Sequence, residues 1–165
     1  MSLSLLQSYS FADVFGTVTG PGGVSIPLGA GSGSSAEEGI SFEQTVYSNM
    51  MTVGAAGDGM HTLIQNNSGR VSIHLLKTSP LNAQLNQMLV YQKSSSLYWG
   101  INTITVANPV TGDQYTCTQA AFKRRPNNQY SKDPNQIIWE FDAVNVFATL
   151  GSGIAGVVAG IVSRI

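Results

Sequence analysis

The sequence predicts a mainly β protein, an antiparallel β-sandwich or barrel with one flanking α-helix. Short runs of β-branched and aromatic residues recur along the chain, and apolar and polar side chains alternate within them. Clusters of Gly, Pro and Asn separate these runs, as turns between strands do. One stretch, residues 80–92, instead places apolar residues at the spacing of a helical face. We therefore expect several strands with a single helix packed beside them.

The first part of the chain predicts two strands separated by a loop. Residues 10–19 alternate and end in the turn sequence Gly-Pro-Gly-Gly at 20–23. The stretch 24–35 contains so much Gly and Ser that we expect an extended, exposed N-proximal loop. Residues 39–47 alternate again and predict a strand. The Gly-Asp-Gly sequence that ends the stretch 49–59 indicates a turn, because glycine tolerates positive φ.

The middle of the chain contains the clearest strand and the helix. Residues 70–77 alternate strictly. In the helix that follows, Thr78 or Ser79 is the expected cap and Pro80 the first residue, and the helix should end near residue 92 or 93. Its apolar face comprises Leu81, Leu85, Met88 and Leu89.

The last part predicts a hairpin, a loop and a final strand. Residues 101–107 and 114–123 form the hairpin around an Asn-Pro turn. Residues 125–134 are a polar loop, and 136–146 alternate as the last strand.

We expect one domain at residues 1–150 and an apolar, Gly-rich C-terminal tail at 151–165. The tail includes Gly156-x-x-x-Gly160 after Ser152, a pattern that can pack membrane helices. The uncharged stretch is at the lower edge of the roughly 17 to 25 residues that a membrane span requires. A docked or mobile tail is therefore favoured over a membrane anchor.

The composition favours association with other protein chains. Charged residues make up 10% of the chain, against roughly 25% in a typical domain. The formal net charge is only -1, and proteins that stay dispersed usually carry more. Apart from Lys123, Arg124 and Arg125 the cations are scattered, which disfavours nucleic-acid binding.

The residues that could carry chemistry form no catalytic, cofactor or metal site. His61 and His74 lack the spacing of zinc ligands. Cys117 is the single cysteine, and its neutral, alternating neighbours predict a half-buried strand position. Glu37 and Glu38 sit beside the Gly/Ser loop, where solvated charge is the usual explanation. The sequence contains no secretory signal, which predicts synthesis in the cytoplasm, and we expect no enzymatic activity.

Several stretches, taken in order, resemble the tail tube subunits of contractile-tail phages, a phage structural protein family. The pieces span about residues 9–151, and the helical segment LLKTSPLNAQL at 75–85 is the strongest of them. They are YSFADV (9–14), GPGG (20–23), EEGI (37–40), MTVGAAGDGM (51–60), SGR (68–70), LLKTSPLNAQL (75–85), WGIN (99–102), GD (112–113), AFK (121–123) and WEF (139–141).

The resemblance implies a virion protein that is assembled in the host cytoplasm. Such subunits join as hexameric rings, which stack into the inner tube of the tail and form a conduit through which DNA passes without specific binding. Tail sheath, baseplate and tape-measure proteins would be the partners. The alternatives are the tube of a related injection machine, an R-type bacteriocin or a type VI secretion needle, and a small membrane-associated protein.

Two groups of residues are candidates for roles in such an assembly. Lys123, Arg124 and Arg125 could contact acidic groups of a neighbouring subunit, or simply keep a strand edge soluble. The lumen would be lined by polar residues of the 39–47 strand and of the segment 61–67, with those three cations elsewhere. The candidate lining is Ser41, Glu43, Thr45, Gln65 and Asn67.

Overall fold

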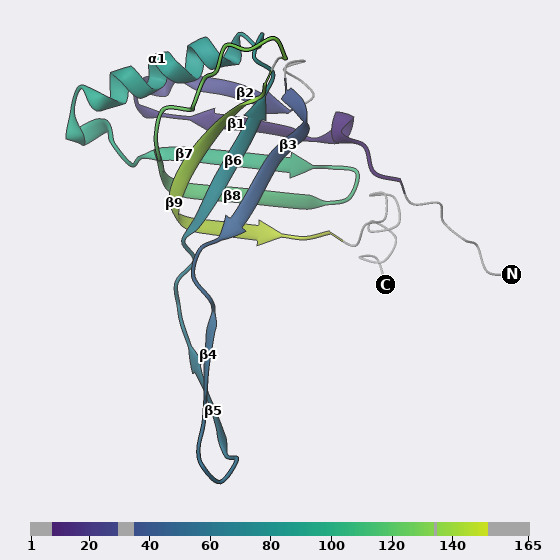
Figure 1. Cartoon of the computed structure of the whole chain (residues 1–165), viewed down its shortest axis with the longest axis vertical. Coiled ribbons are helices and arrows are strands. Elements are labelled where there is room, and N and C mark those ends of the chain that lie inside the picture. The colour runs from purple at the N-terminus through teal and green to yellow at the C-terminus, as the bar shows by residue number, and fades with distance from the viewer. Residues whose placement is uncertain (1–7, 30–34, 134, 152–165) are drawn as a thin grey trace, which may run out of the picture.

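The computed structural model describes residues 8–29, 35–133 and 135–151, with the side chains of 35–38 left out. Within these ranges seven strands form one antiparallel sheet in the order β2-β1-β7-β8-β9-β6-β3, and β4 and β5 form a separate hairpin (Figure 1). The strands are β1 (Phe15–Thr19), β2 (Ser25–Gly29), β3 (Ser35–Gln44), β4 (Asn49–Val53), β5 (Gly59–Leu63), β6 (Gly69–Leu75), β7 (Asn102–Asn108), β8 (Asp113–Phe122) and β9 (Ile137–Thr149). The helix α1 is Leu81–Lys93, and the short 3-10 turns are η1 (Phe11–Asp13), η2 (Pro21–Gly23) and η4 (Ser96–Tyr98).

The long strand β9 joins the two halves of the sheet. Its first part pairs with β6 and its last part with β8, so β3 and β6 cross in front of β7 and β8 (Figure 1). Gln119, whose φ is 52°, lies where the register between β7 and β8 shifts by one residue, a β-bulge of the kind that bends a strand. The ring of Phe42 in β3 stacks on Tyr115 in β8 with centroids 4.3 Å apart. The sheet therefore folds back on itself, which confirms the predicted β-sandwich or barrel class.

The core lies between the two halves of the sheet and under α1. The predicted alternation within 70–77 and 136–146 is confirmed, since alternate residues of β6 and of the first part of β9 are buried. The predicted apolar face of the helix is also confirmed, because Leu81, Leu85, Met88 and Leu89 are all buried. Trp139 Nε1 of β9 donates to Asn82 Oδ1 of α1 at 3.0 Å and ties the helix to the sheet.

The helix begins one residue later than the sequence predicts. Pro80 takes the N-cap position without a side-chain hydrogen bond, and of the two expected cap residues it is Ser79 whose Oγ accepts from the backbone N–H of Leu81, at 3.2 Å. Pro80 precedes the first helical residue, with helical φ and ψ of its own. A difference of one residue between the expected and the observed start of a helix is common.

Two predictions for the N-terminal third are wrong in part. Residues 10–19 do not form one strand, because Ser10 Oγ accepts from Ala12 N–H and caps the 3-10 turn η1. The predicted loop at 24–35 contains β2, where Ile26 and Leu28 are each 1% exposed. Pro27 between them is tolerated because an edge strand need not use every N–H. Residues 30–34 of that predicted loop lie outside the described ranges.

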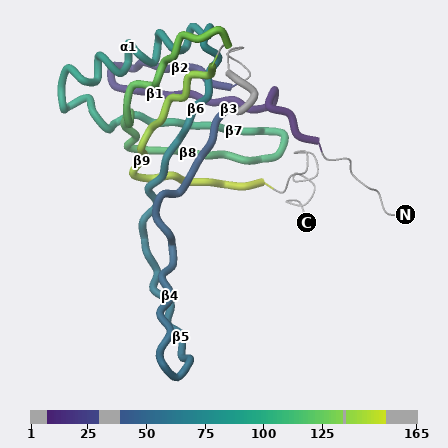
Figure 2. Tube along the Cα trace, viewed as in Figure 1, coloured from purple at the N-terminus to yellow at the C-terminus, as the bar shows by residue number. Residues whose placement is uncertain are grey.

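The hairpin of β4 and β5 projects from the sheet and was missed as a pair of strands (Figures 1 and 2). The predicted turn is present, with Gly57 at φ 90° and Gly54 N–H donating to Asp58 O at 2.7 Å. Every residue of β4 is exposed, and so is most of β5. A strand exposed on both faces needs no alternation of apolar and polar residues, so the usual sequence signal is absent.

Candidate assembly surfaces

The outward side of β3, β6 and β9 forms a polar face. Strand register places Glu43, Arg70 and Asp142 in one cross-strand row, and Ser41, Ser72 and Glu140 in the next. The residues between them point into the core. We call this the polar face; its members are Ser41, Glu43, Arg70, Ser72, Glu140, Asp142 and, from the end of β8, Lys123.

Charges on the polar face are nearly balanced. Arg70 Nε lies 3.8 Å from Asp142 Oδ1, and Lys123 Nζ lies 3.9 Å from Glu140 Oε2. These side chains are between 24% and 55% exposed, so each pair adds little to stability. With Glu43 as the remaining charge, the face carries three carboxylates against two cations, a surface without strong attraction for a polyanion.

The structure brings only part of the predicted lumen lining together. Ser41 and Glu43 are exposed on the polar face. Thr45, Gln65 and Asn67 lie instead at the base of the hairpin, where Thr45 Oγ1 donates to Ser68 O at 3.2 Å. The strand predicted to reach residue 47 ends at Gln44. Which of these residues line a lumen stays a prediction.

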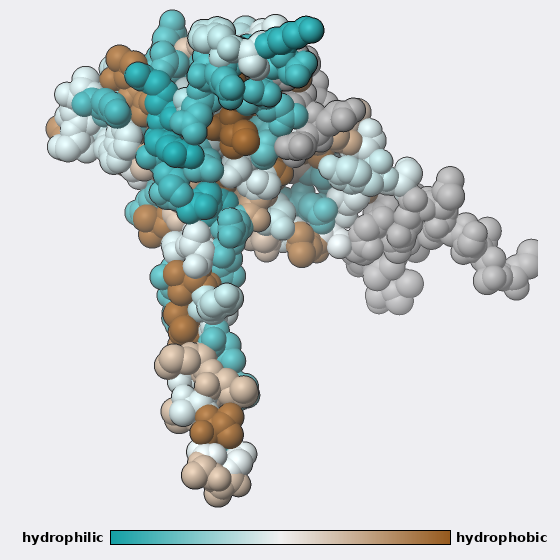
Figure 3. All heavy atoms as spheres, in the orientation of Figure 1, coloured by the Kyte–Doolittle hydropathy of each residue, from teal (hydrophilic) through white to brown (hydrophobic). Residues whose placement is uncertain are grey.

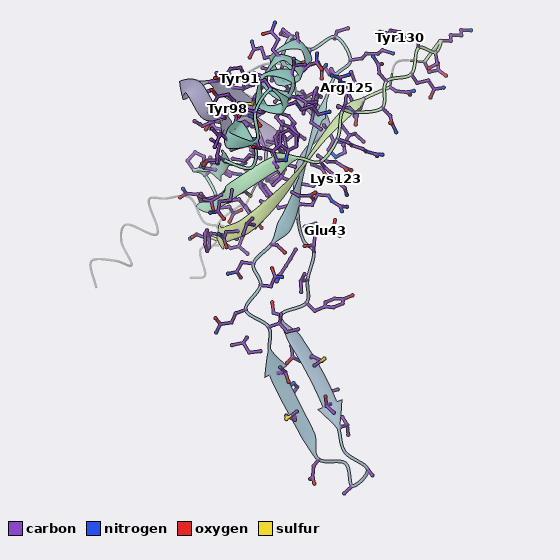
Figure 4. The ribbon with its side chains drawn as sticks, turned by 90° about the vertical axis from the view of Figure 1, so that its left-hand side faces the viewer. Glu43, Tyr91, Tyr98, Lys123, Arg125 and Tyr130 are labelled. Carbon is purple, nitrogen blue, oxygen red and sulfur yellow. The ribbon has the colours of Figure 1, made fainter. Side chains whose placement is uncertain are left out.

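Lys123, one of the three neighbouring cations, lies on the same face as part of that candidate lining. Lys123 N–H donates to Glu140 O at 2.9 Å, so Lys123 belongs to the polar face. Figure 4 shows Glu43, Lys123 and Arg125 on the same side of the molecule. A lumen that includes Glu43 and excludes Lys123 would therefore need its boundary between these two residues.

A hollow lies beside the loop that follows β8. Its volume is about 250 Å³, and Lys77 and Arg124 are part of its lining. Lys77 is held there, because its Nζ donates to Gln129 O and lies 4.3 Å from the centroid of the Tyr130 ring. The remaining lining is mostly amide side chains, which can donate hydrogen bonds to an incoming acceptor.

The hairpin presents apolar side chains to solvent. Met50, Met51, Val53, Met60 and Leu63 are between 55% and 72% exposed. Figure 3 shows hydrophobic residues along the length of the hairpin. An isolated two-stranded hairpin is marginally stable in water. Exposed apolar residues on such an element are typical of a surface that another chain covers.

Residues considered for catalysis or metal binding are not gathered into a site. His61 Nδ1 lies 3.1 Å from Asn49 Nδ2 in the hairpin, whereas His74 is in β6. Cys117 is fully buried rather than half-buried, and burial raises the pKa of its thiol to about 11. Among the described residues, no group of three or more His, Cys, Asp and Glu could hold a metal ion. The side chains of Glu37 and Glu38 lie outside the described part.

A second hollow, of about 330 Å³, opens between β3, β7 and β8. Among the described residues of its lining, Asp113 is the one carboxylate. Its two oxygens accept hydrogen bonds from Thr111 Oγ1 at 2.9 Å and from Gly151 N–H at 2.8 Å. This carboxylate therefore holds the β7–β8 turn against the end of β9.

In the described ranges, no helix is both long and apolar enough to cross a membrane. The tail residues 152–165, for which the sequence left a membrane anchor open, lie outside those ranges. A folded-back sheet with a projecting apolar hairpin defines a β-rich protein with an exposed apolar surface of the kind that other chains commonly cover.

Comparison with known proteins assigns the chain to a family. The family model described as Bacteriophage PhiTE tail tube protein matches residues 6–151. The chain therefore belongs to this family of phage tail tube proteins, which confirms the resemblance seen in the sequence. It is a structural protein of a phage tail and so a component of the virion.

Comparison with solved structures finds one with a shared fold, at low sequence identity. The chain is similar to one from the anti-feeding prophage cap, which terminates the AFP tube, with a TM-score of 0.54, 12% identity and coverage of 92% of this chain and 97% of that one. A PVC sheath–tube complex of an extracellular contractile injection system in its extended state gives a TM-score of 0.48, 13% identity and coverage of 82% and 88%. No curated protein sequence matches the chain.

Proposed function

We propose that the chain is the tube subunit of a contractile phage tail, that it assembles into stacked hexameric rings, and that the rings form a passive conduit for DNA. The observation that carries this proposal is the exposed apolar hairpin, β4 and β5. Its surface has no partner within the described chain, and a second copy that covers it would remove that surface from water.

The unpaired edge strands of the sheet support a proposal in which strands pair between copies and close a ring. Within the described ranges β2 and β3 are the end strands of the sheet. Pro27 lies in β2 and limits the N–H groups that this edge can offer. The edge of β3 carries no proline, so a neighbouring subunit could extend the sheet there and continue it as a barrel around a lumen.

The polar face supports the role of a DNA conduit. A duplex carries a charge about every 1.7 Å, and each Lys or Arg that contacts it adds salt-dependent binding. On the polar face Lys123 and Arg70 are each paired with a carboxylate, which lowers their attraction for phosphate. A wall of this kind would let DNA pass without gripping it.

The subunit acts in this proposal as a structural part and not as an enzyme. Sheath, baseplate and tape-measure proteins are its expected partners, and assembly takes place in the host cytoplasm. Among the alternatives, a bacteriocin tube and a type VI secretion needle, the match to a phage tail tube family favours the phage tail.

Self-association tests the proposal. We expect the purified protein to sediment as rings or larger species, and negative-stain images to show rings or hollow tubes. Heterologous contacts that close on rotation produce rings of this kind. A protein that remains monomeric over a wide concentration range, with no tubes in the images, would contradict the proposal.

A further inference from the structure

Positive charge is concentrated at one corner of the molecule. Four of the seven Lys and Arg in the described ranges lie there with one carboxylate, Glu140, a balance of +3. The other three cations and eight carboxylates of those ranges give the rest a balance of −5. We call this region the basic corner; its cations are Lys77, Lys123, Arg124 and Arg125.

The basic corner and the hairpin tip lie at opposite ends of the molecule. Figure 1 has the longest axis vertical, with the hairpin at one end and the body of the protein at the other. Figure 4 places Tyr130 and Arg125 at the end away from the hairpin. A copy stacked head to tail along this axis would therefore bring its hairpin tip toward the basic corner of the next copy.

The hollow at the basic corner is suited to a carboxylate. Lys77 and Arg124 line it together with the amides of Asn127, Asn128 and Asn135, and its one acidic lining residue among those described, Glu140, is paired with Lys123. Lys77 is already positioned by Gln129 O and the Tyr130 ring. Within the described part of the chain neither Arg124 nor Arg125 forms an ion pair. Charge-assisted hydrogen bonds to a carboxylate are stronger than neutral ones.

The hairpin tip offers one carboxylate on a narrow turn. Residues 54–59 read Gly-Ala-Ala-Gly-Asp-Gly, so Asp58 has the only side chain larger than a methyl group. Between Glu43 and Arg70, Asp58 is also the only Asp, Glu, Lys or Arg. Backbone bonds from Gly54 N–H to Asp58 O and from Gly57 N–H to Gly54 O, at 2.7 and 3.0 Å, hold the turn. The turn is therefore preformed.

We infer that the basic corner of one subunit receives the Asp58 hairpin tip of a second copy, in a head-to-tail contact between stacked rings. The inference rests on the proposed function and adds to it the residues of one contact. Apolar side chains along the hairpin supply the buried area, and the charge pair fixes the direction and depth of docking. Complementary charges chiefly set orientation, specificity and association rate.

Charge reversal tests the contact in the full-length protein. The variants are Asp58→Lys, Arg124→Glu with Arg125→Glu, and all three substitutions together. Lys93→Glu is the control, because it reverses an exposed cation of α1 away from the corner. Pelleting gives the critical concentration for tube formation, sedimentation measures smaller assemblies, and melting temperatures verify that each variant is folded.

We expect each reversal to raise the critical concentration at least about tenfold, the triple variant to recover most of this loss, and the control to resemble the wild type. Wild-type tubes should also form less readily at high salt. Tubes from Asp58→Lys and from the Arg124/Arg125 variant at the wild-type concentration would overturn the inference and leave the proposed function intact. The inference would also be overturned if both reversals raised the critical concentration and the triple variant did not lower it again.

Two further outcomes separate the inference from its alternatives. Duplex DNA that shifts in a gel with the wild type, and not with the Arg124/Arg125 variant, would make the corner a nucleic-acid surface and overturn the inference. Wild-type association without tubes would refute the proposed function, while recovery of association in the triple variant would still support the charge pair. A wild type that never associates would refute both.

Discussion

At the scale of single residues, the buried amide pair of Gln92 and Asn102 joins the helix to the sheet. Both side chains are fully buried. Gln92 Nε2 donates to Asn102 Oδ1 at 2.6 Å, and Asn102 Nδ2 donates to Gln92 Oε1 at 2.9 Å. The pair could not be predicted from the sequence, because Gln92 was expected only as the end of a helix and Asn102 as a strand residue. Their complementarity exists only once β7 lies under α1.

A double-mutant cycle tests this pair. Gln92→Leu leaves the amide of Asn102 buried without its partner, so we expect the free energy of unfolding to fall by about 1 to 3 kcal/mol. Gln92→Leu with Asn102→Leu should lose less than the sum of the single variants, because no unsatisfied amide remains. Urea denaturation measures both. Additive losses would contradict the coupling.

Cys117 gives a prediction on pH at the same scale. Burial raises the thiol pKa to about 11 in the folded protein, whereas an unfolded thiol has a pKa of about 8.5. Below pH 8.5 or so both thiols are protonated and the free energy of unfolding does not depend on this group. Between about 8.5 and 11 the unfolded thiol ionises first, so this contribution to stability is lost as pH rises.

The wild type should therefore lose more stability than Cys117→Ala when pH rises from 8 to 10 or so. Urea denaturation of both proteins at each pH isolates the effect from the tyrosines and lysines, which the two proteins share. Parallel losses in the two proteins would contradict the burial of this thiol.

At the scale of elements, predictability followed burial. The helix and the strands β6 and β9 were predicted with their faces, because each buries one side and so carries a clear period. The strand β2 was missed because Gly and Ser around it masked a two-residue apolar pattern, Ile26 and Leu28. The hairpin was missed because both of its faces are exposed. Thr45, Gln65 and Asn67 were assigned to the same lining as Ser41 and Glu43 because the sequence did not show that the hairpin begins after Gln44.

The helix should depend on its buried leucine. Leu85 is fully buried, so Leu85→Ala should lower the free energy of unfolding by about 2 to 5 kcal/mol. Val90→Ala on the exposed side of α1 is the matched control, since Val90 is 54% exposed, and should change it by about 0.5 kcal/mol or less. Equal effects of the two substitutions in chemical denaturation would place the Leu85 face outside the core.

The hairpin should be dispensable for folding and required for assembly. Ser48 and Ile64 already approach each other, since Ile64 N–H donates to Ser48 O at 2.9 Å. Replacement of residues 49–63 by Asn-Gly, a dipeptide that favours two-residue turns, should leave a cooperative melting transition near that of the wild type. Tubes should not form. A shortened protein that still assembles would remove the main support for the proposed function.

At the scale of the whole molecule, the uneven charge distribution and the projecting hairpin give the subunit a direction. The sequence revealed the low charge and the family resemblance, and these predicted a self-assembling tail protein. It did not reveal that the basic corner and the hairpin tip lie at opposite ends, because the hairpin and Arg125 acquire that relation only through the path of the sheet (Figure 4).

Helical reconstruction of the assembled protein by electron cryomicroscopy tests the central claim most directly. We predict stacked rings of six subunits, with the polar face of β3, β6 and β9 toward the lumen and Arg124 and Arg125 at contacts between rings. An assembly that is not a hollow tube of hexameric rings, or a lumen ringed by Arg124 and Arg125 together with Lys123, whereas the account admits only Lys123 there, would contradict the account.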